Sequence, residues 1–574
     1  MRISKIQIKN FKNLKNVVLS DLGNIVVLIG KNSSGKSNLL EALCLFFNQF
    51  NLVEPSPISA VAGVDHYLWH NLETKNPIEI ILELEFDANE CEEIFPKVAL
   101  GILRKKFPDS YCRVIFCREL AGAKAGWRTE YVKWADILIA GNNKLVTPDA
   151  FCQSLAVCVS TEAKATSPIP ESEGAKIIGK ITSSLQDRIK GKFKMARVCR
   201  GSVERSSGVV EQTLIMAADT RETLRLLGQS HNHRDMQWWT EIEEIFETSS
   251  SMRLDVRGNE IFARKNNLYL PLHLIGGGDQ EILTLKNFLL HSEKAIVAIE
   301  EPEMHLHPQL VKRVLKLVKE STCNSQIFLV THSSTILENV YARCVWVAKT
   351  EGKETRYIGL HDVEDLENVL AELDIPLSDL LFAERILLVN GLLEKAMLPI
   401  LARNLGVDAD TFFIVPVTLR HEEPDCGLFL FRRKPPGQYH LKVWNEFSRK
   451  INTPLFLLLY EDARNEVETL VSEGSLKARN CTILPTSLGN NMPLETLINV
   501  LNENYDLHLS INDINARKPR IDEIRRILAT SGKLHSGWMT LVAEKVALKM
   551  SKEKIPNEIK MLFEDMMKVP KSSP

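Results

Sequence analysis

A glycine-rich stretch near the start of the chain has the residue types and spacing of a phosphate-binding loop. Residues 30–37 read GKNSSGKS, which fits the pattern G-x-x-x-x-G-K-[ST]. Backbone N–H groups of such a loop, and of the helix that it opens, face the phosphates of a nucleotide. We expect Lys36 to reach the β- and γ-phosphates of ATP and the Ser37 hydroxyl to coordinate Mg²⁺. The predicted nucleotide contacts are Gly30, Asn32, Ser33, Ser34, Gly35, Lys36, Ser37 and Asn38.

The elements that flank this loop decide between a phosphate site and a chance Gly/Ser/Lys turn. Residues 24–30, NIVVLIG, form an unbroken apolar run that predicts a buried strand. From Gly35 onward, apolar residues recur at helical spacing as far as Phe46. A strand before the loop and a helix after it are the context that the motif demands. The pattern therefore favours the phosphate site.

Two adjacent carboxylates end a second apolar run. Residues 295–308 read AIVAIEEPEMHLHP, which predicts a buried strand ending in Glu300 and Glu301. A nucleotide site needs one carboxylate to hold the metal through water and another to orient the attacking water. We assign the metal to Glu300 and the role of catalytic base to Glu301. The alternative is a pair of solvated charges at the end of a strand.

A histidine ends a third apolar run. Residues 326–334 read QIFLVTHSS, a buried strand followed by Thr331, His332 and Ser333. A lone histidine is more often a satisfied core residue than a catalytic one. Here it ends the strand that is predicted to follow the carboxylate strand, so it could hydrogen-bond the γ-phosphate and sense its loss.

Three consecutive glycines stand before a further predicted helix. Residues 274–283 read LIGGGDQEIL, with the run at Gly276, Gly277 and Gly278. Such a run favours an anion-binding nest of backbone N–H groups. A flexible loop is the alternative interpretation.

These four pieces, in this order, resemble the ABC-type ATPases of the RecF, SMC and OLD group over roughly residues 1–350. KIQIKNFKNLKNVVL near the N-terminus resembles the first strands of that group, and EEPEMHLHP resembles the Walker B and D-loop of OLD-type ATPases. The resemblance implies that the glycine run is the signature loop and that His332 is the switch histidine. It also implies a head-to-tail homodimer, in which Gly276–Gly278 of one chain close over ATP held by Lys36 of the other. Gly277 stands where a signature serine is often found, which predicts slow turnover.

The resemblance to OLD-family proteins continues into their Toprim domain at residues 375–406. In that fold one strand ends in a glutamate followed by glycine, and a second strand ends in D-x-D; these acids bind the metals that cleave a phosphodiester. Here Asn390 occupies the first position and Tyr460-Glu461-Asp462 the second, so only Asp462 of the three acids is present. An amide and a phenol cannot supply the charge that holds two hard cations. We therefore predict a degenerate Toprim-like domain, and an active nuclease using Asp462 and nearby Glu394 is the alternative.

Length and composition set the broad class. A chain of 574 residues is too long for one core, so we predict at least two domains. They are an α/β, ABC-type P-loop ATPase head over 1–382, with an inserted helical segment at about 150–260, and a Toprim-like α/β domain over 383–574. No apolar run is long enough for a membrane span, and no signal region precedes the first strand. Scattered cysteines without a C-x-x-C pair favour reduced thiols and a cytoplasmic location.

The formal net charge of −2 leaves any nucleic-acid contact to local basic clusters. Arg and Lys neutralise phosphates, and interleaved aromatic residues can stack on unpaired bases. A solvated charged face is the alternative. The first cluster is Lys190, Lys192, Lys194, Arg197 and Arg200. The second is Phe431-Arg432-Arg433-Lys434 with Tyr439 and Trp444, and Arg104-Lys105-Lys106 is a weaker third.

An ATPase with an OLD-like layout and an eroded nuclease site must act through another molecule. That profile resembles the PtuA family, the ATPase subunits of Septu-type anti-phage systems, some of which are associated with retrons. The resemblance implies an HNH-type nuclease partner of the PtuB kind and, in retron versions, a reverse transcriptase with its DNA–RNA product. Two other hypotheses are a self-sufficient OLD-type nuclease regulated by ATP and a RecF- or SMC-like DNA-repair ATPase. The last is disfavoured because no sustained heptads lie between Lys36 and Gly276.

Overall fold

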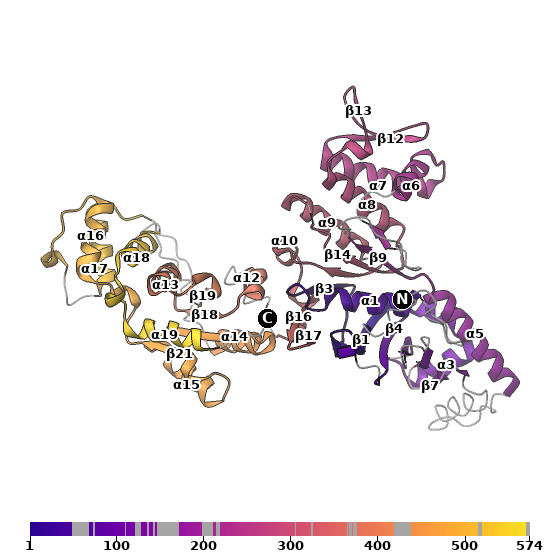
Figure 1. Cartoon of the computed structure of the whole chain (residues 1–574), viewed down its shortest axis with the longest axis horizontal. Coiled ribbons are helices and arrows are strands. Elements are labelled where there is room, and N and C mark those ends of the chain that lie inside the picture. The colour runs from indigo at the N-terminus through magenta and orange to yellow at the C-terminus, as the bar shows by residue number, and fades with distance from the viewer. Residues whose placement is uncertain are drawn as a thin grey trace. The chain divides into compact units, whose positions relative to one another are not determined.

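The computed structural model arranges the chain in two units, both drawn in Figure 1. It describes residues 1–48, 68–72, 75–109, 111–120, 128–134, 137–141, 144–145, 171–197, 211–213, 218–304, 306–322, 325–363, 366, 370, 376–417, 438–514, 519–535 and 537–569. The first unit is Met1–Leu360 and the second is His361–Pro574. No helix within the described ranges has the length and apolar character needed to cross a membrane.

One sheet of the first unit is antiparallel, with the strand order β2-β1-β4-β5-β6-β7-β8. Its strands are β1 (Arg2–Phe11), β2 (Leu14–Leu19), β4 (Ile78–Glu85), β5 (Arg113–Leu120), β6 (Arg128–Trp134), β7 (Ile137–Gly141) and β8 (Lys144–Leu145). Along β4 the buried residues Ile78, Ile80, Leu82 and Leu84 alternate with partly exposed ones. This alternation is typical of a strand with one face on the core and one face toward water.

The second sheet carries the predicted motifs and has the order β10-β9-β14-β15-β3-β16-β17. Its strands are β3 (Ile25–Ile29), β9 (Phe193–Arg197), β10 (Glu211–Thr213), β14 (Ile296–Glu300), β15 (Gln326–Val330), β16 (Val345–Glu351) and β17 (Glu354–Gly359). β14 pairs in parallel with β15, and β15 pairs in parallel with β3. The carboxyl ends of these three strands therefore meet at one edge, as the α/β prediction requires.

Part of the segment predicted to be an inserted helical region contributes strands to this sheet. β9 pairs in parallel with β14, with Met195 opposite Ala298. A five-residue strand, FKMAR, is too short to show a clear period in the sequence. Helices α5 (Glu171–Ile189), α6 (Ala218–Gln229) and α7 (His233–Ser250) account for much of the rest.

Helix α1 (Lys36–Asn48) begins within the predicted phosphate loop and is held between the two sheets. Leu39 and Leu43 are fully buried, in a core shared with Ile6 of β1, Leu28 of β3 and Val330 of β15. Burial of about 25 cal/mol per Å² of apolar surface makes such a helix a firm support. The start of α1 is thereby fixed at the edge where the parallel strands end.

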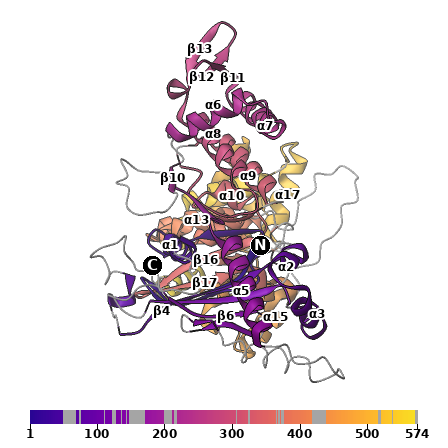
Figure 2. The ribbon, with the colours of Figure 1, turned by 90° about the vertical axis from the view of Figure 1, so that its right-hand side faces the viewer.

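A further part of the first unit combines helices with a small antiparallel sheet of order β11-β12-β13. Its elements are β11 (Arg253–Arg257), β12 (Glu260–Lys265), β13 (Leu268–Pro271), η3 (Leu272–Leu274), α8 (Gly277–Leu290), α9 (Pro308–Ser321) and α10 (Ser334–Leu337). Helices α6 and α7 pack against β11, and α8 packs against both α7 and α9. Figure 2 shows the small sheet at the far end of this part. Two short helices, α2 (Ala88–Ile94) and α3 (Lys97–Lys106), follow β4.

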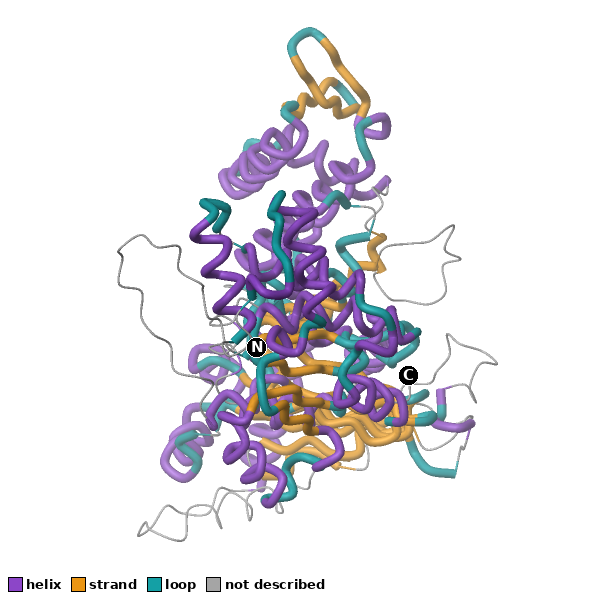
Figure 3. The backbone as a smooth tube through the Cα atoms, turned by 90° about the vertical axis from the view of Figure 1, so that its left-hand side faces the viewer, coloured by secondary structure: helices purple, strands orange, loops and turns teal. Residues whose placement is uncertain are grey.

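The second unit is built on a parallel sheet of order β19-β18-β20-β21. The strands are β18 (Ile386–Val389), β19 (Phe413–Pro416), β20 (Leu455–Tyr460) and β21 (Cys481–Leu484). The helices are α12 (Leu377–Phe382), α13 (Leu392–Leu405), α14 (Gln438–Ile451), α15 (Arg464–Ser472), α16 (Leu494–Tyr505), α17 (Arg520–Thr530), α18 (Trp538–Lys549) and α19 (Asn557–Lys568). Figure 3 draws the helices of the chain in purple and its strands in orange. All four residues of β18 are buried, which is typical of a central strand covered on both faces.

Candidate functional site

The loop of residues 30–37 needs glycine at both of its glycine positions. Gly30 has φ +151° and Gly35 has φ +95°. A Cβ at Gly30 would lie 2.3 Å from the carbonyl oxygen of Ala348, and one at Gly35 would lie 2.7 Å from Oγ1 of Thr355. A side chain at either position would therefore collide with strand β16 or β17 of the same chain, whether or not a phosphate is bound.

Residues far away in the sequence brace the loop, and sequence reasoning missed them. Thr355 Oγ1 donates a hydrogen bond of 2.9 Å to the Ser34 carbonyl, and the Tyr357 hydroxyl donates one of 3.0 Å to the Gly35 carbonyl. These bonds join positions 321 and 322 residues apart. No local spacing signals such a pair, because it arises only when β17 reaches the loop.

The side chains of the loop take different positions. Asn32 and Ser33 are exposed, whereas Ser34 is buried, and its Oγ has no hydrogen-bond partner among the described residues. Asn38, predicted to contact the nucleotide, donates a hydrogen bond of 2.7 Å from Nδ2 to Oδ1 of Asn13. This hydrogen bond ties Asn38, near the start of α1, to Asn13, which is therefore a further residue of the site.

Lys36 is buried at this edge of the sheet. Its Nζ donates hydrogen bonds of 2.8 Å to the carbonyls of Gly30 and Lys31. Burial lowers the pKa of Lys36 to about 8, and the carboxylates of Glu301 and Glu300 oppose that shift. A phosphate would add a strong negative charge beside the ammonium and favour its charged form.

Ser37 and Glu300, the two residues predicted to hold the metal, lie in contact with each other. The Ser37 hydroxyl donates a hydrogen bond to Oε1 of Glu300. Hydroxyl and carboxylate oxygens are the ligands that Mg²⁺ prefers, and Mg²⁺ keeps several of its waters when it binds. The donor set at this edge therefore fits the predicted metal.

Glu301 and His332 lie together at the ends of β14 and β15. Glu301 has a left-handed backbone, φ +48°, and its N–H donates a hydrogen bond of 2.8 Å to the Val330 carbonyl. Its Oε1 lies 3.8 Å from Nε2 of His332. Burial lowers the pKa of His332, the positive charge of Lys36 lowers it further, and Glu301 acts in the opposite direction. The imidazole is therefore held in its neutral form beside the carboxylate.

A third glutamate in the same segment, Glu303, was not singled out from the sequence. Oε1 of Glu303 accepts hydrogen bonds of 2.7 Å from the Thr331 hydroxyl and 2.7 Å from the His332 backbone N–H. Burial raises the pKa of Glu303, although these hydrogen bonds oppose the shift. The only sequence signal is a third acid in EEPE, which by itself is indistinguishable from a solvated charge.

The glycine run does not adopt the predicted nest. The αR-αL form of a nest contains a left-handed residue, and none of Gly276, Gly277 and Gly278 has a positive φ. Gly276 is the N-cap of α8, and Gly276 and Gly277 are exposed. A Cβ on Gly278 would lie 2.8 Å from Cδ1 of Leu310, so this glycine packs against the start of α9. The run thus presents backbone N–H groups at a helix N-terminus, which also favours anions.

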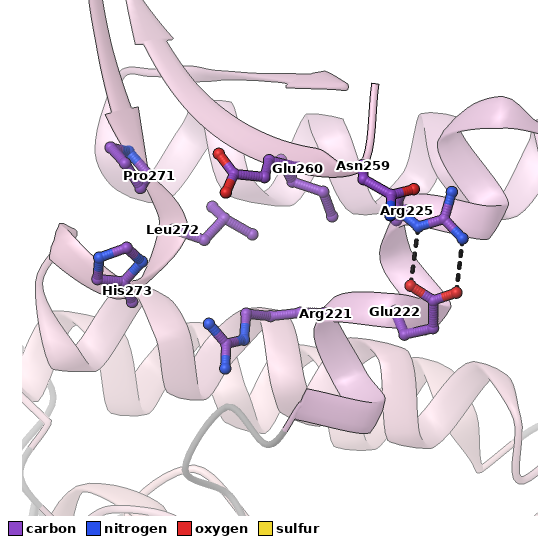
Figure 4. Close-up of a pocket in the computed structure, with 9 residues that line it drawn as sticks. Arg221, Glu222, Arg225, Asn259, Glu260, Pro271, Leu272 and His273 are labelled. Atoms are coloured by element: carbon purple, nitrogen blue, oxygen red, sulfur yellow. Dashed lines mark hydrogen bonds and ion pairs between the residues drawn. The ribbon is translucent and has the colours of Figure 1, made fainter. Parts of the chain in front are cut away.

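A pocket of about 280 Å³ lies beside the residues that lead into the glycine run (Figure 4). Within it, Arg225 of α6 pairs with both carboxylate oxygens of Glu222, at 2.8 and 2.5 Å. The pocket is lined by Arg221, Glu222, Arg225, Asn259, Glu260, Ile261, Pro271, Leu272 and His273. None of the predicted site residues is among them, so this pocket is separate from the edge that carries Lys36.

Glu394 and Tyr460 of the second unit belong to one hydrogen-bonded cluster. Glu394 is 2% exposed; its Oε2 accepts a hydrogen bond of 3.0 Å from the Gly391 N–H, and its Oε1 accepts one from the Tyr460 hydroxyl. The Tyr460 oxygen also accepts a hydrogen bond of 3.3 Å from the Leu488 N–H. Burial raises the pKa of Glu394 to about 7.

The two acids after Tyr460 lie at the surface. β20 ends at Tyr460, and Glu461 and Asp462 belong to the short helix η7 (Glu461–Ala463). Both are exposed, and Glu461 is paired with Arg464 at 2.6 Å. Across the described residues, no group of three or more His, Cys, Asp or Glu side chains is placed to hold a metal ion.

One predicted aromatic partner for nucleic acid is wrong, and most of the second basic cluster lies outside the described residues. Trp444 is 0% exposed and contacts Phe447 edge to face, because α14 turns these apolar side chains inward. It cannot stack on a base. In the first cluster, Lys194 donates a hydrogen bond to the His291 carbonyl. Arg200, residues 431–434 and the side chains of Lys105, Lys106, Arg197 and Tyr439 lie outside the described part.

A family model described as the AAA ATPase domain matches residues 1–117 and 162–337, about half of the chain. The matched residues include the loop with Lys36, the carboxylates of β14 and the histidine after β15.

Three curated proteins are similar over much of their own length. The OLD nuclease of Thermus scotoductus is 24% identical over 442 residues, which cover 74% of this chain and 77% of the relative. The endonuclease GajA of Bacillus cereus is 26% identical over 431 residues, 69% of this chain and 67% of the relative. An ATP/GTP phosphatase of Helicobacter pylori is 22% identical over 353 residues, 58% of this chain and 86% of the relative.

Proposed function

The chain belongs to the AAA ATPase domain family, and on that premise we propose that it is the ATP-hydrolysing subunit of an anti-phage defence complex. The first unit binds ATP and hydrolyses it slowly, and a separate HNH-type nuclease of the PtuB kind cleaves nucleic acid. The observation that carries the ATPase half is the convergence of Lys36, Glu301 and His332 at the edge where the parallel strands β3, β14 and β15 end.

Each residue of that edge has a chemical role in the proposal. The Lys36 ammonium moves from the two backbone carbonyls that it now contacts to the β- and γ-phosphates. Ser37 and Glu300 would hold Mg²⁺, whose positive charge would offset the negative charge that develops on the phosphates. Glu301 orients the attacking water and accepts its proton. Neutral His332 donates a hydrogen bond to the γ-phosphate and loses that partner after hydrolysis.

Hydrolysis in this proposal requires two copies of the chain arranged head to tail. Gly276 and Gly277 are exposed at the N-terminus of α8, where backbone N–H groups are available to an anion. We assign them to the γ-phosphate of ATP held by Lys36 of the second copy. Gly277 brings no side-chain hydroxyl to that contact, which is consistent with slow turnover. Slow turnover suits a latch, in which bound nucleotide keeps one assembly state populated.

The second unit is the reason for proposing that a separate protein cleaves the nucleic acid. Two of the similar proteins are named as nucleases, and we propose that this unit is a degenerate Toprim-like domain kept for shape or partner binding. Asn390 brings no charge to the end of β18, and the hydroxyl of Tyr460 donates a hydrogen bond to the carboxylate of Glu394. In a retron-associated version, a reverse transcriptase and its DNA–RNA product also bind.

A self-sufficient nuclease regulated by ATP is the second candidate function. It is favoured by the length of the similarity to the OLD nuclease, which exceeds that of the matched ATPase domain. It is also favoured by Asp462, a carboxylate exposed just after β20. In this alternative Asp462 and Glu394 would bind the metal.

Co-purification from the native operon tests the proposal. The chain is tagged at its genomic locus, and every bound protein and nucleic acid is identified, with an untagged strain as the control. We expect an HNH-type nuclease, with or without a reverse transcriptase and its DNA. A chain that comes out alone and cleaves DNA with Mg²⁺ would establish the second candidate instead.

A further inference from the structure

Glu303 joins the segment that follows β14 to the end of β15. One of its carboxylate oxygens, Oε1, accepts both the Thr331 hydroxyl and the His332 backbone N–H, each at 2.7 Å. The other oxygen, Oε2, is buried and has no hydrogen-bond partner among the described residues. A carboxylate taken out of water in this way is costly unless its hydrogen bonds compensate for the lost hydration.

The bonds of Glu303 belong to a network that places both catalytic candidates. The Thr331 hydroxyl, which donates to Glu303, also accepts a hydrogen bond of 2.9 Å from the Ser333 N–H. Glu301 is tied to the same strand through its N–H, which donates to the Val330 carbonyl at 2.8 Å. Glu301 and the His332 ring lie 3.8 Å apart. The backbone hydrogen bond of Glu301 to Val330 and the side-chain hydrogen bond of Glu303 to the His332 N–H hold the two residues in that arrangement.

The two donors that Glu303 satisfies belong to the strand end that carries the proposed γ-phosphate contact. The Thr331 hydroxyl is fully buried, and the His332 N–H belongs to the residue whose ring lies 3.8 Å from Glu301. Holding them with a buried carboxylate fixes the orientation of the residue that carries the imidazole. Displacement of a catalytic group by about 1 Å can cost a factor of about 100 in rate.

We propose that Glu303 is a positioning residue for ATP hydrolysis that acts through His332. The inference rests on the proposed ATPase site and adds a residue to it. Glu303 contacts neither substrate nor metal in this account. It holds the His332 backbone so that the imidazole remains beside Glu301 and faces the γ-phosphate.

The first test compares steady-state ATP hydrolysis by the full-length wild-type chain, Glu303→Ala and Glu303→Gln. Glu303→Ala should lower kcat about 10- to 100-fold and leave KM and ATP affinity unchanged, because Lys36 keeps its place. Glu303→Gln should retain most of the rate, because the amide oxygen can accept both hydrogen bonds. The matched control is Glu243→Ala, a partly buried carboxylate on α7 of the same unit, which should leave kcat unchanged.

A double-mutant cycle with His332→Ala tests whether Glu303 acts through the histidine. In the His332→Ala background, Glu303→Ala should have little further effect on kcat. Additive losses, or equal losses in the alanine and glutamine variants, would overturn the proposal. So would a loss of ATP affinity that parallels the loss of kcat.

A readout that needs no hydrolysis separates this proposal from the ATPase proposal. The His332 imidazole resonance is assigned in labelled full-length protein by its disappearance in His332→Gln. It should move in Glu303→Ala and stay in place in Glu303→Gln. A wild-type chain with no more ATPase activity than Lys36→Ala would end the ATPase proposal, and an unmoved imidazole resonance would end the positioning proposal.

Discussion

The hydroxyl of Tyr460, at the end of β20, donates a hydrogen bond to the buried carboxylate of Glu394 on α13. The same tyrosine oxygen accepts the N–H of Leu488. A phenol therefore ties together three segments at the edge of the sheet where the resemblance to Toprim domains implied an acid. Each carboxylate oxygen of Glu394 has a hydrogen-bond donor within the fold.

Removing the hydroxyl tests that structural role. In Tyr460→Phe, Glu394 and the Leu488 N–H each lose a partner inside the fold. The cost expected for unsatisfied buried groups is about 1–3 kcal/mol of the free energy of unfolding. Thermal and urea unfolding of the full-length chain measure this loss, which is read from the unfolding transition of the second unit. An unfolding curve identical to the wild type would contradict the cluster.

The stability of the second unit should fall as pH rises toward neutrality. Burial raises the pKa of Glu394 to about 7, above its unfolded value, so the folded state binds more protons between these two values. The stabilisation is fully present below about pH 4.5 and is lost as pH rises through about 7, by roughly 3 kcal/mol. Glu394→Gln should flatten this dependence in urea unfolding at pH 5 and pH 7.5. A wild-type curve that is equally stable at both pH values, or an unchanged slope in Glu394→Gln, would sink this prediction.

Lys36→Ala should abolish ATP binding and, in the native host, phage protection. The ammonium is the charged donor that the loop brings to the phosphates, and its loss should weaken ATP affinity by a factor of about 100 or more, so that no binding is detected. Titration calorimetry with ATP and Mg²⁺ measures the affinity, and plaque counts measure protection. Lys312→Ala, an exposed lysine on α9, is the matched control and should bind ATP as the wild type does. Normal ATP affinity in Lys36→Ala would remove the phosphate site from the account.

Glu301→Gln should separate binding from hydrolysis. The amide keeps the shape of the side chain but cannot accept the proton of the attacking water, so kcat should fall by a factor of about 100 or more. ATP affinity should remain close to that of the wild type, because Lys36 and the loop are intact. If Glu301→Gln hydrolyses ATP normally, another group is the base.

The nucleotide edge could be predicted because its signals are local. Each of β3, β14 and β15 is an unbroken apolar run that ends in the residues that matter, and parallel pairing gathers those ends. The braces Thr355 and Tyr357 could not be predicted in this way, because they reach the loop from more than 300 residues away.

Other parts of the prediction failed for physical reasons that can be named. Trp444 is one of the aromatic residues that could stack on bases by sequence, yet Leu441, Trp444 and Phe447 recur at helical spacing, which places the indole on the buried face of α14. The glycine run was expected to form a nest, but its residues begin a helix with negative φ angles. The contact between Tyr460 and Glu394 joins positions 66 residues apart and has no local signature.

The central claim is that this ATPase does not itself cut nucleic acid, and a cleavage assay with the purified chain tests it most directly. Plasmid and linear DNA are incubated with Mg²⁺ or Mn²⁺, with and without ATP, using Asp462→Ala as the matched control. We predict that wild type and Asp462→Ala leave the DNA equally intact while the wild type hydrolyses ATP. Metal-dependent cleavage by the wild type that Asp462→Ala abolishes would contradict the account and make the second unit a nuclease.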